Sequence, residues 1–312
     1  MEPQGIFAID VLCVGHASFD LTMTIDHHPG PDEKCTAVAL LECGGGPAAN
    51  AAVAVARLGG ISAFAGYLGE DLYGVRHLEE LLREGVNTAM AARGTPPTPI
   101  SFILVKPDGR RTVVNYKAET PFLDIAQIDF SCCSPKVILF DGHEPQISVP
   151  LARSARGAKT VVTVLDAGSV HQGTVDLALL VDYLVASEKF ARDFTGEKSL
   201  QRALQALHQR APAVVISLGE KGVVWKNNEG EGGFSAFHVE AVDTTGAGDT
   251  LHGAFALEIA RGENFRSALH FACTAAALSC KKHGARPSIP TRAEVEDFLK
   301  SSSQGRESRA TS

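Results

Sequence analysis

Residues 242–255 read VDTTGAGDTLHGAF, a segment in which small residues stand directly before an aspartate and an apolar run follows at once. The small residues are Gly246, Ala247 and Gly248, and the aspartate is Asp249. We expect a buried helix to begin near Ala247, because the residues that follow suit a helix and a glycine ends the run. The segment therefore predicts a glycine turn at the start of a helix.

Such a turn is suited to hold an anion. The first N–H groups of a helix lack intrahelical partners, and its amino end carries a partial positive charge. Asp249 would lie in the first turn, where it can accept a proton from a substrate hydroxyl while the N–H groups hold phosphoryl oxygens. An aspartate there could also merely complement the helix dipole, worth about 0.3–1 kcal/mol, but this alternative leaves the three small residues unexplained. The segment therefore favours phosphoryl transfer.

A second glycine-rich segment, CGGGPAANAAVAVARLGG, occupies residues 43–60. Its glycines let the backbone N–H groups come close to a ligand. Pro47 is tolerated at the start of the alanine-rich run, and Asn50 falls in the first turn of the expected helix. The segment matches neither a phosphate-binding P-loop nor a dinucleotide fingerprint. The alternative is a tight loop that opens a closely packed helix.

Short apolar runs alternate with helix-like segments over most of the chain, which predicts α/β units around a mostly parallel central sheet. Ligands bind such sheets at the carboxyl ends of the strands, so the polar residues there are candidates. The expected strands are 10–15, 62–69, 136–142, 160–166, 182–187 and 213–219, and expected helices include 72–84, 147–156 and 197–209. The strand-end candidates are Asp141, His143, Asp166, Ser187, Glu188, Ser217 and Gly219.

Residues 19–43 and 98–116 break this rhythm with alternating patterns, and a Pro-Asp-Gly turn at 107–109 predicts a β-hairpin. We expect a small sheet from these two segments, acting as a lid over one domain that spans residues 1–300. The polar tail 301–312 is expected to be disordered.

The composition narrows the class of protein. A formal net charge of −7 argues against nucleic-acid or anionic-membrane partners. The seven cysteines include no C-x-x-C pair, which favours reduced thiols over a zinc or redox motif. The amino terminus lacks the order of a signal peptide, and the apolar stretches are too short to span a bilayer. We expect a soluble, cytoplasmic protein.

Taken together, the two glycine-rich segments resemble the two signatures of the ribokinase-like sugar kinases, the PfkB carbohydrate kinase family. Their order and separation also match, and the likeness covers about residues 10–300. The resemblance implies a three-layer α/β/α domain with a β-sheet lid, and transfer of the γ-phosphoryl group of ATP, with Mg²⁺, to a sugar hydroxyl. It implies that Asp249 is the catalytic base and that the N–H groups of Thr245, Gly246, Ala247 and Gly248 form the anion hole.

The same resemblance implies a set of sugar contacts. They are Asp20 at the lid hinge, Gly45, Gly46, Asn50 and Asn115. The pattern is most similar to the branch of sulfofructose kinase and related ketose kinases. His143 stands where that branch has an arginine for the anionic group of its substrate; it is either a substrate contact or a structural loop residue. A histidine lacks the bidentate fork of arginine, which favours a sugar such as a ketose over a sulfonated one.

The resemblance also implies where nucleotide and ions bind. The segment SLGEKG at 217–222 resembles the nucleotide loop, and residues 268–280 would flank the adenine. Residues 283–290 resemble a loop that holds K⁺ with the segment around Asp243, so K⁺ activation is an expectation. Glu188 would act on Mg²⁺ through water, although Val185 replaces the asparagine of the usual Asn-x-x-Glu. The nucleotide candidates are Ser217, Gly219, Gly222, Thr245 and Ala276, and the K⁺ candidates are Asp243 and Ser288.

Two other functions fit the sequence. One is a nucleoside kinase of the same fold, in which Phe19, Phe102 and Tyr116 of the lid would stack on a base. The other is a non-catalytic sugar-binding protein, which would not need Asp249. Lids of this kind also lead us to expect a homodimer formed through the lid.

Overall fold

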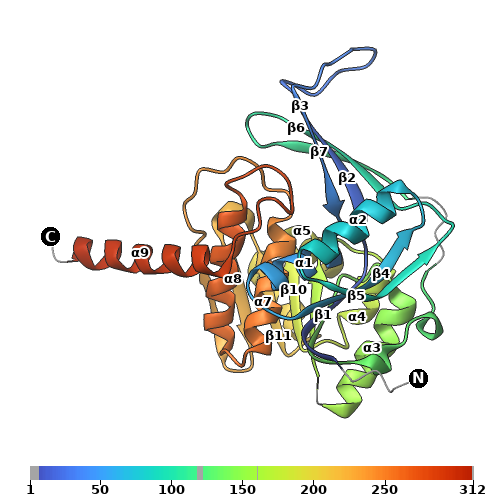
Figure 1. Cartoon of the computed structure of the whole chain (residues 1–312). Coiled ribbons are helices and arrows are strands. Elements are labelled where there is room, and N and C mark those ends of the chain that lie inside the picture. Colours follow the sequence, from blue (N-terminus) through green and yellow to red (C-terminus); the bar gives the residue numbers. More distant parts are fainter. Residues whose placement is uncertain (1–6, 118–121, 160, 311–312) are drawn as a thin grey trace.

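The protein is described here by a computed structural model that covers residues 7–117, 122–159 and 161–310 (Figure 1). Within these ranges a central sheet is formed by nine strands. They are β1 (Phe7–Val14), β4 (Ser62–Gly69), β5 (Asn87–Gly94), β8 (Cys133–Phe140), β9 (Val162–Ala167), β10 (Tyr183–Ser187), β11 (Ala213–Ser217), β12 (Val223–Asn227) and β13 (Gly230–Phe234). Their order across the sheet is β13-β12-β11-β10-β9-β8-β1-β4-β5.

The strand pairs from β11 to β5 are parallel, whereas β12 and β13 add an antiparallel edge. The mostly parallel sheet predicted from the sequence is therefore confirmed. Strand β1 shows why its sequence is a continuous apolar run. Val11 and Cys13 pack into one core and Leu12 and Val14 into the other, because successive side chains point to opposite faces.

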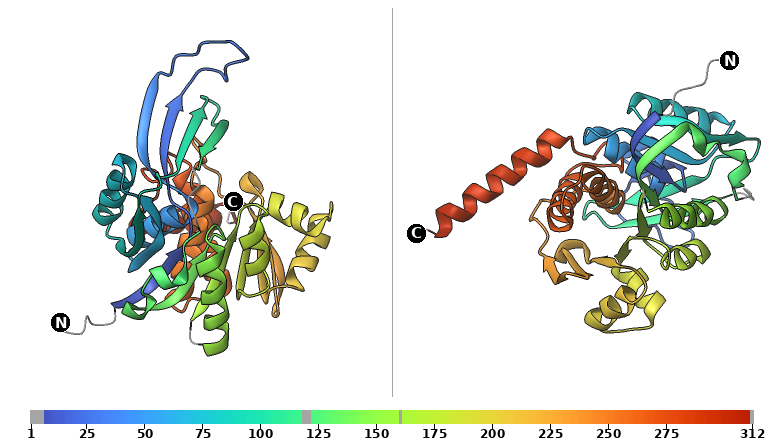
Figure 2. Two further views of the ribbon diagram at one scale, coloured as in Figure 1. Left: turned by 90° about the vertical axis from the view of Figure 1, so that its right-hand side faces the viewer. Right: turned by 90° about the horizontal axis from the view of Figure 1, so that it is seen from below.

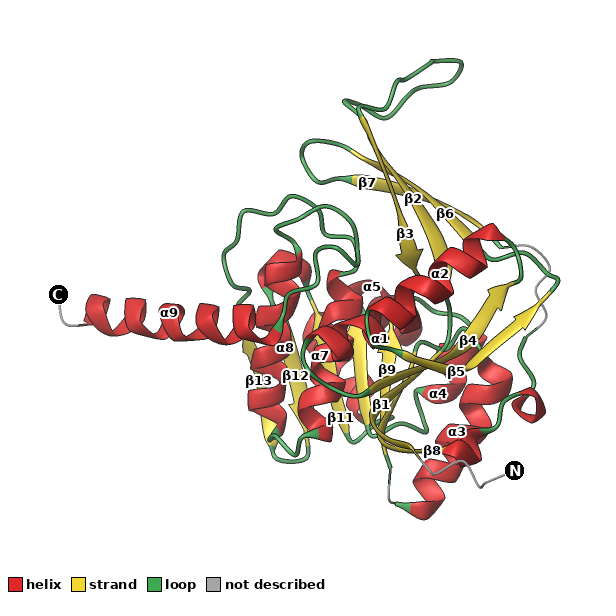
Figure 3. Cartoon of the chain, in the orientation of Figure 1, coloured by secondary structure: helices red, strands yellow, loops and turns green. Residues whose placement is uncertain are grey.

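Helices cover both faces of this sheet (Figures 2 and 3). The core of one face includes side chains from α1 (Pro47–Arg57), α2 (Leu72–Arg83), α7 (Ala247–Ala260) and α8 (Phe265–Ser279). The core of the other includes α3 (Pro145–Ala158), α4 (Gln172–Leu177), α5 (Glu188–Thr195) and α6 (Leu200–His208). Short 3-10 turns are η1 (Ile125–Gln127), η2 (Phe130–Cys132) and η3 (Gly219–Lys221). The three-layer arrangement expected from the resemblance is present.

A smaller sheet stands over one end of the large one, at the top of Figure 1. It consists of β2 (Ser18–Thr24), β3 (Ala39–Gly45), β6 (Ile100–Val105) and β7 (Arg111–Tyr116), in the order β3-β2-β6-β7. The turn between β6 and β7 uses Gly109, whose φ of 75° lies in the left-handed region that favours glycine. The hairpin predicted from the Pro-Asp-Gly sequence is thus present, and the small sheet is the lid.

The last helix, α9 (Arg292–Ala310), extends away from the body of the protein (Figure 1). We expected residues 301–312 to form a disordered tail, but the structure continues this helix to Ala310. Once a helix has begun, each further residue adds a backbone hydrogen bond without a new nucleation cost, so a polar composition does not by itself end it. Residues 311–312 lie outside the described residues. Across the described ranges, no helix is both long and apolar enough to cross a membrane.

Candidate active site

Helix α7 begins at Ala247, where the Gly-Ala-Gly sequence predicts it. Gly246 is the N-cap residue with a φ of 76°, and a Cβ added there would lie 2.8 Å from the Cβ of Ala285. Gly246 is therefore required by the backbone. Gly248 differs, because an added Cβ would meet no atom within 4 Å. The first turn of α7 thus opens onto space that a ligand can fill.

Two of the N–H groups expected in the anion hole have partners within the protein. The N–H of Thr245 donates to Oδ1 of Asp243 at 2.9 Å, and the N–H of Ala247 donates to the carbonyl oxygen of Thr244 at 3.3 Å. The turn around Gly248, rather than Thr245, is therefore the candidate position for a bound anion.

Asp249 lies in the first turn of α7, as predicted, and faces helix α1. The side-chain amide of Asn50 donates to Oδ2 of Asp249 at 2.7 Å. Burial and the nearby charge of Asp166 raise the pKa of Asp249 to about 7. A carboxyl group with a pKa near neutrality is well suited to exchange a proton with a bound hydroxyl. The two glycine-rich segments are therefore connected at Asp249, through its hydrogen bond with Asn50.

His252 and Asp166 are parts of the site that the sequence analysis did not assign to a role. His252 Nδ1 lies 2.6 Å from the carbonyl oxygen of Gly248 and 3.3 Å from Oδ2 of Asp166, and its Nε2 lies 3.1 Å from the carbonyl oxygen of Val185. The ring therefore ties the first turn of α7 to the carboxyl ends of β9 and β10. The sequence signal for His252 was its position three residues after Asp249 on the expected helix, which places the two side chains on the same face.

Asp20 approaches the same site from the lid. It is buried, and Ser18 Oγ donates to its Oδ1 at 2.9 Å. A Cβ on Gly45 would lie 2.2 Å from the Asp20 carboxylate, so only glycine leaves room for this side chain. The pKa of Asp20 is raised by burial, and its charge in turn contributes to the raised pKa of Asp249. The structure thus brings the hinge aspartate within electrostatic reach of the candidate base.

The strand register of the lid places Asn115 in the same row of paired residues as Asp20, with Ser101 between them. Cys43, Asp20, Ser101 and Asn115 are successive partners across β3, β2, β6 and β7. Directly paired residues project from the same face of a sheet. Asn115, on the outer strand, therefore shares the lid face that carries Asp20.

Arg286 is a fully buried residue that the sequence analysis missed. Its Nε donates to Oδ1 of Asn50 at 3.1 Å, and its guanidinium also contacts His77 and lies 3.4 Å from Oε1 of Glu80. A Cβ on Gly44 would overlap the guanidinium. Arg286 therefore orients the amide that contacts Asp249, and it connects the first glycine segment to the 283–290 loop. In the sequence, Arg286 could have been noticed as the arginine within the segment HGARPSIP, residues 283–290.

Three histidine rings cluster at the carboxyl ends of the strands. The rings of His16 and His143 have centroids 5.2 Å apart, and those of His143 and His171 stack at 4.5 Å. The backbone N–H groups of His16 and His143 donate to the two oxygens of Asp141, at 2.8 and 2.9 Å. Burial and neighbouring His143 lower the pKa of His16 to about 3, so its ring is neutral near pH 7. His143 thus lies between the rings of His16 and His171, in a cluster whose backbone is held by Asp141.

The loop after β11 carries the nucleotide candidates. Ser217 ends the strand, and its Oγ donates to the carbonyl oxygen of Ala186 at 3.3 Å. Gly219 has a φ of 60° and open space around it, which suits a ligand contact. A Cβ on Gly222, in contrast, would lie 2.0 Å from the carbonyl oxygen of Phe234, so packing against β13 already requires glycine there. Ala276 lies on α8.

The ion candidates have different surroundings. Glu188 begins α5, and its carboxylate accepts from Arg192 at 2.5 Å while remaining partly exposed. Asp243 is buried; its Oδ1 accepts from Thr245, and its Oδ2 accepts from the N–H of Gly284 at 2.9 Å. Asp243 therefore fastens the segment before α7 to the 283–290 loop, within which Ser288 Oγ donates to Ala285. The two loops expected to form a K⁺ site do lie together.

Comparison with known sequences identifies the family of this chain. The family model described as pfkB family carbohydrate kinase matches residues 8–292. The ribokinase of Bacillus subtilis is 32% identical over 298 residues, which cover 93% of this chain and 99% of that protein. The fructokinase of Solanum tuberosum is 30% identical over 289 residues, which cover 83% of this chain and 87% of that protein.

Comparison with solved structures gives the same result. Ribokinase from Thermotoga maritima has a TM-score of 0.83 and 30% identity, and the match covers 94% of this chain and 99% of that one. Arabidopsis thaliana ribokinase complexed with ribose and ATP has a TM-score of 0.80 and 26% identity, with coverage of 94% and 99%. The fold, the glycine turn before Asp249 and these likenesses together show that this chain belongs to the pfkB family of carbohydrate kinases, which are phosphotransferases with an alcohol group as acceptor.

Proposed function

We propose that this carbohydrate kinase transfers the γ-phosphoryl group of ATP to a hydroxyl of a sugar bound beneath the lid, with Asp249 as the general base. The observation that carries the proposal is the position of Asp249, which lies in the first turn of α7 beside an open glycine turn and has its pKa raised to about 7. The related Arabidopsis thaliana ribokinase was solved with ribose and ATP, which supports both substrates.

The residues divide the chemistry between them. Asn50 donates to Oδ2 of Asp249, so we assign acceptance of the hydroxyl proton to Oδ1. The turn around Gly248, at the positive end of α7, stabilises the negative charge of the transferring group. Positioning and charge stabilisation supply most of the catalysis in phosphoryl transfer, and a general base contributes roughly 10²–10⁴-fold.

The sugar lies between the lid and the carboxyl ends of the strands. Asp20 and Asn115 reach it from one lid face, Asn50 from α1, and His143 from the histidine cluster. Gly45 and Gly46 let the backbone approach it. We favour a ketose, which the sequence pattern suggests and the likeness to a fructokinase supports.

The lid geometry favours a sugar over a nucleoside. The aromatic residues that would stack on a base do not share the face of Asp20. Phe102 on β6 and Tyr116 on β7 are adjacent in sequence to Ser101 and Asn115, so they project from the opposite face, where they are exposed. Phe19, adjacent to Asp20 on β2, is buried against Tyr73.

ATP is assigned to the side of the site formed by Ser217, Gly219 and Ala276, with Thr245 nearby on the approach to α7. Mg²⁺ neutralises phosphate charge when it is bound, and the partly exposed carboxylate of Glu188 suits a contact through water. Asp243 and Ser288 mark the K⁺ candidate, whose test is the dependence of kcat on K⁺ with Na⁺ as the matched control.

A homodimer through the lid is supported by the face opposite Asp20. That face exposes four large apolar side chains, at Leu40, Phe102, Val114 and Tyr116. An apolar patch of this kind on a protruding sheet is typical of a protein interface.

The function is tested by sugar-dependent release of ADP from Mg·ATP, measured over ketoses, aldoses and nucleosides. We expect turnover with a sugar and its loss in Asp249→Asn. Turnover with nucleosides alone would show that the acceptor is a nucleoside and not a sugar. Sugar binding without turnover on any acceptor would indicate a non-catalytic binding protein.

A further inference from the structure

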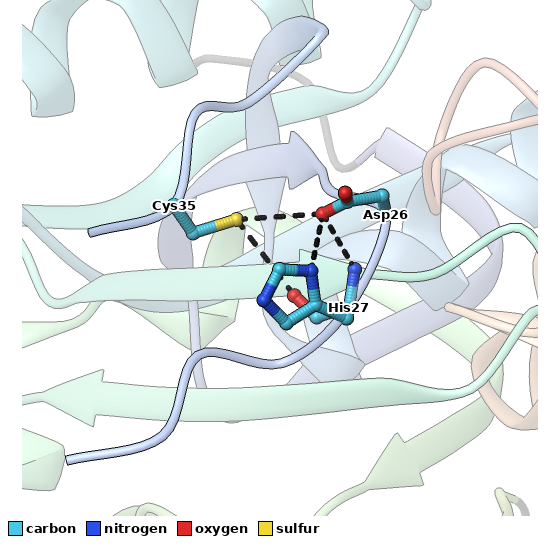
Figure 4. Close-up of side chains that lie close together, drawn as sticks. All are labelled: Asp26, His27 and Cys35. Carbon is cyan, nitrogen blue, oxygen red and sulfur yellow. Dashed lines mark hydrogen bonds and ion pairs between the residues drawn. The ribbon is translucent and has the colours of Figure 1, made fainter. Parts of the chain in front are cut away.

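The connection between β2 and β3 reaches out at the tip of the lid, away from the site of phosphoryl transfer (Figures 1 and 2). Three side chains of this connection, Asp26, His27 and Cys35, turn toward one another (Figure 4). One donor atom from each lies within 4.8 Å of the other two. The cluster combines a carboxylate, an imidazole and a thiol, which are the three ligand types that proteins use for zinc.

The spacing of the donor atoms fits one ion. Cys35 Sγ lies 3.7 Å from Oδ1 of Asp26. Two ligands at typical Zn–S and Zn–O lengths, about 2.3 and 2.1 Å, are about 3.6 Å apart in a tetrahedral site. His27 Nδ1 lies 2.7 Å from the same oxygen, a hydrogen-bond distance that must open by less than about 1 Å for both atoms to bind one ion. Only small side-chain movements are therefore needed.

Glu33 supplies the support that a metal-binding histidine commonly has. Its Oε1 lies 2.6 Å from His27 Nε2, and its Oε2 accepts from the N–H of Gly30 at 2.8 Å. A carboxylate that holds one ring nitrogen as N–H leaves the other nitrogen free to bind a metal and fixes the ring orientation. Here the nitrogen available to a metal is Nδ1, whose hydrogen bond to Asp26 the ion would replace.

The local charge also favours a cation. Residues 26–35 carry three acidic side chains, Asp26, Asp32 and Glu33, against one lysine, Lys34. A mixed set of sulfur, nitrogen and oxygen ligands matches Zn²⁺ better than Mg²⁺ or Ca²⁺, which prefer oxygen alone. Three protein ligands leave the fourth tetrahedral position to water.

We propose that Asp26, His27 and Cys35 form a zinc site at the tip of the lid and that Glu33 positions His27 within it. The ion would join the segment that leaves β2 to the segment that approaches β3 and hold the connection in one conformation. The site does not depend on the proposed sugar kinase activity, so the two can be tested separately.

The test is titration of the full, reduced and metal-free chain with Zn²⁺ alone in competition with a chromophoric chelator. Co²⁺ serves as a spectroscopic probe, because a thiolate ligand gives a near-ultraviolet charge-transfer band. We expect wild type to bind one zinc ion and to show this band. We expect Cys35→Ser to lose the band, and Glu33→Gln to bind zinc roughly 10–100-fold more weakly.

The matched control is Asp32→Asn, which removes a charge from the same connection without touching a proposed ligand. Asp32 has a φ of 60°, a conformation that asparagine tolerates, so this variant keeps the local backbone. We expect its zinc affinity to stay within about threefold of wild type. Trypsin gives a second readout, since zinc should slow cleavage after Lys34 in wild type and not in Cys35→Ser.

Two results would overturn the proposal. One is the absence of saturable zinc binding by the wild-type chain. The other is equal zinc affinity in wild type and Cys35→Ser, which would place the ion elsewhere.

Discussion

Asn50 and Asp249 are 199 positions apart in the sequence, and the side-chain amide of one donates to the carboxylate of the other at 2.7 Å. This contact joins the starts of α1 and α7, the helices that follow the two glycine-rich segments. Arg286 holds the other end of the Asn50 amide. The candidate base is therefore oriented by residues from two other parts of the chain, Asn50 directly and Arg286 through Asn50.

The first prediction concerns pH. Burial and Asp166 raise the pKa of Asp249 to about 7, and only the deprotonated carboxylate can act as the base. We therefore expect kcat/KM for the sugar, which reports the pKa values of the enzyme before sugar binds, to rise with pH through a limb centred near 7 and to level off above it. The measurement is kcat/KM for the sugar across about pH 5–9. A profile that is flat over this range, as expected for an aspartate with the usual pKa near 4, would contradict this account.

The second prediction concerns Asn50. Its hydrogen bond lowers the pKa of Asp249, so Asn50→Ala should raise that pKa and move the acidic limb of kcat/KM for the sugar to higher pH. A hydrogen bond to a charged group is worth about 1.5–3 kcal/mol, which corresponds to a shift of about one pH unit or more. The control is sugar KM, which reports any separate loss of a sugar contact. An unchanged limb would remove Asn50 from the role of orienting the base.

The third prediction separates two glycines of one turn. Gly248→Ala places a methyl group in open space, so we expect the free energy of unfolding to change by less than about 1 kcal/mol while kcat falls at least about 100-fold. Gly246→Ala forces alanine to a φ of 76° and against Ala285, so we expect a lower Tm. Thermal unfolding and kcat are measured on both variants. Full activity in Gly248→Ala would show that the turn does not hold the phosphoryl group.

The fourth prediction concerns assembly. Val114 is 58% exposed on the lid face opposite Asp20, so Val114→Glu should disrupt a dimer formed through that face. Sedimentation velocity of wild type and variant gives the test, and Leu72→Glu, at an exposed position on α2, is the matched control. If wild type is a monomer, or if its dimer persists in Val114→Glu, the lid is not a dimer interface.

Much of this fold follows from local sequence. The strand at 62–69 has the predicted bounds, and α7 begins at the predicted residue, because glycine turns and apolar runs are local signals. The antiparallel edge formed by β12 and β13 was not predicted, since edge pairing depends on a partner strand rather than on a strand's own pattern.

The site residues likewise divide into those with a local sequence signal and those whose role depends on distant contacts. Asp249 was found from its own segment, whereas Arg286, His252 and Asp166 gain their roles only through contacts between distant segments. The position of His252 after Asp249 and that of Arg286 within HGARPSIP mark the two residues, but neither signal shows that their side chains are buried. Gly222 illustrates the reverse case, because a glycine assigned to a ligand is already required by packing against Phe234.

The central claim is that Asp249 removes the proton from the acceptor hydroxyl. The most direct test is Asp249→Asn, which keeps the size of the side chain and an oxygen that can accept from Asn50. Sugar binding is measured by calorimetry and kcat by ADP release. We predict nearly unchanged sugar affinity with kcat lowered on the order of 10²–10⁴-fold. A kcat within about tenfold of wild type would contradict the account.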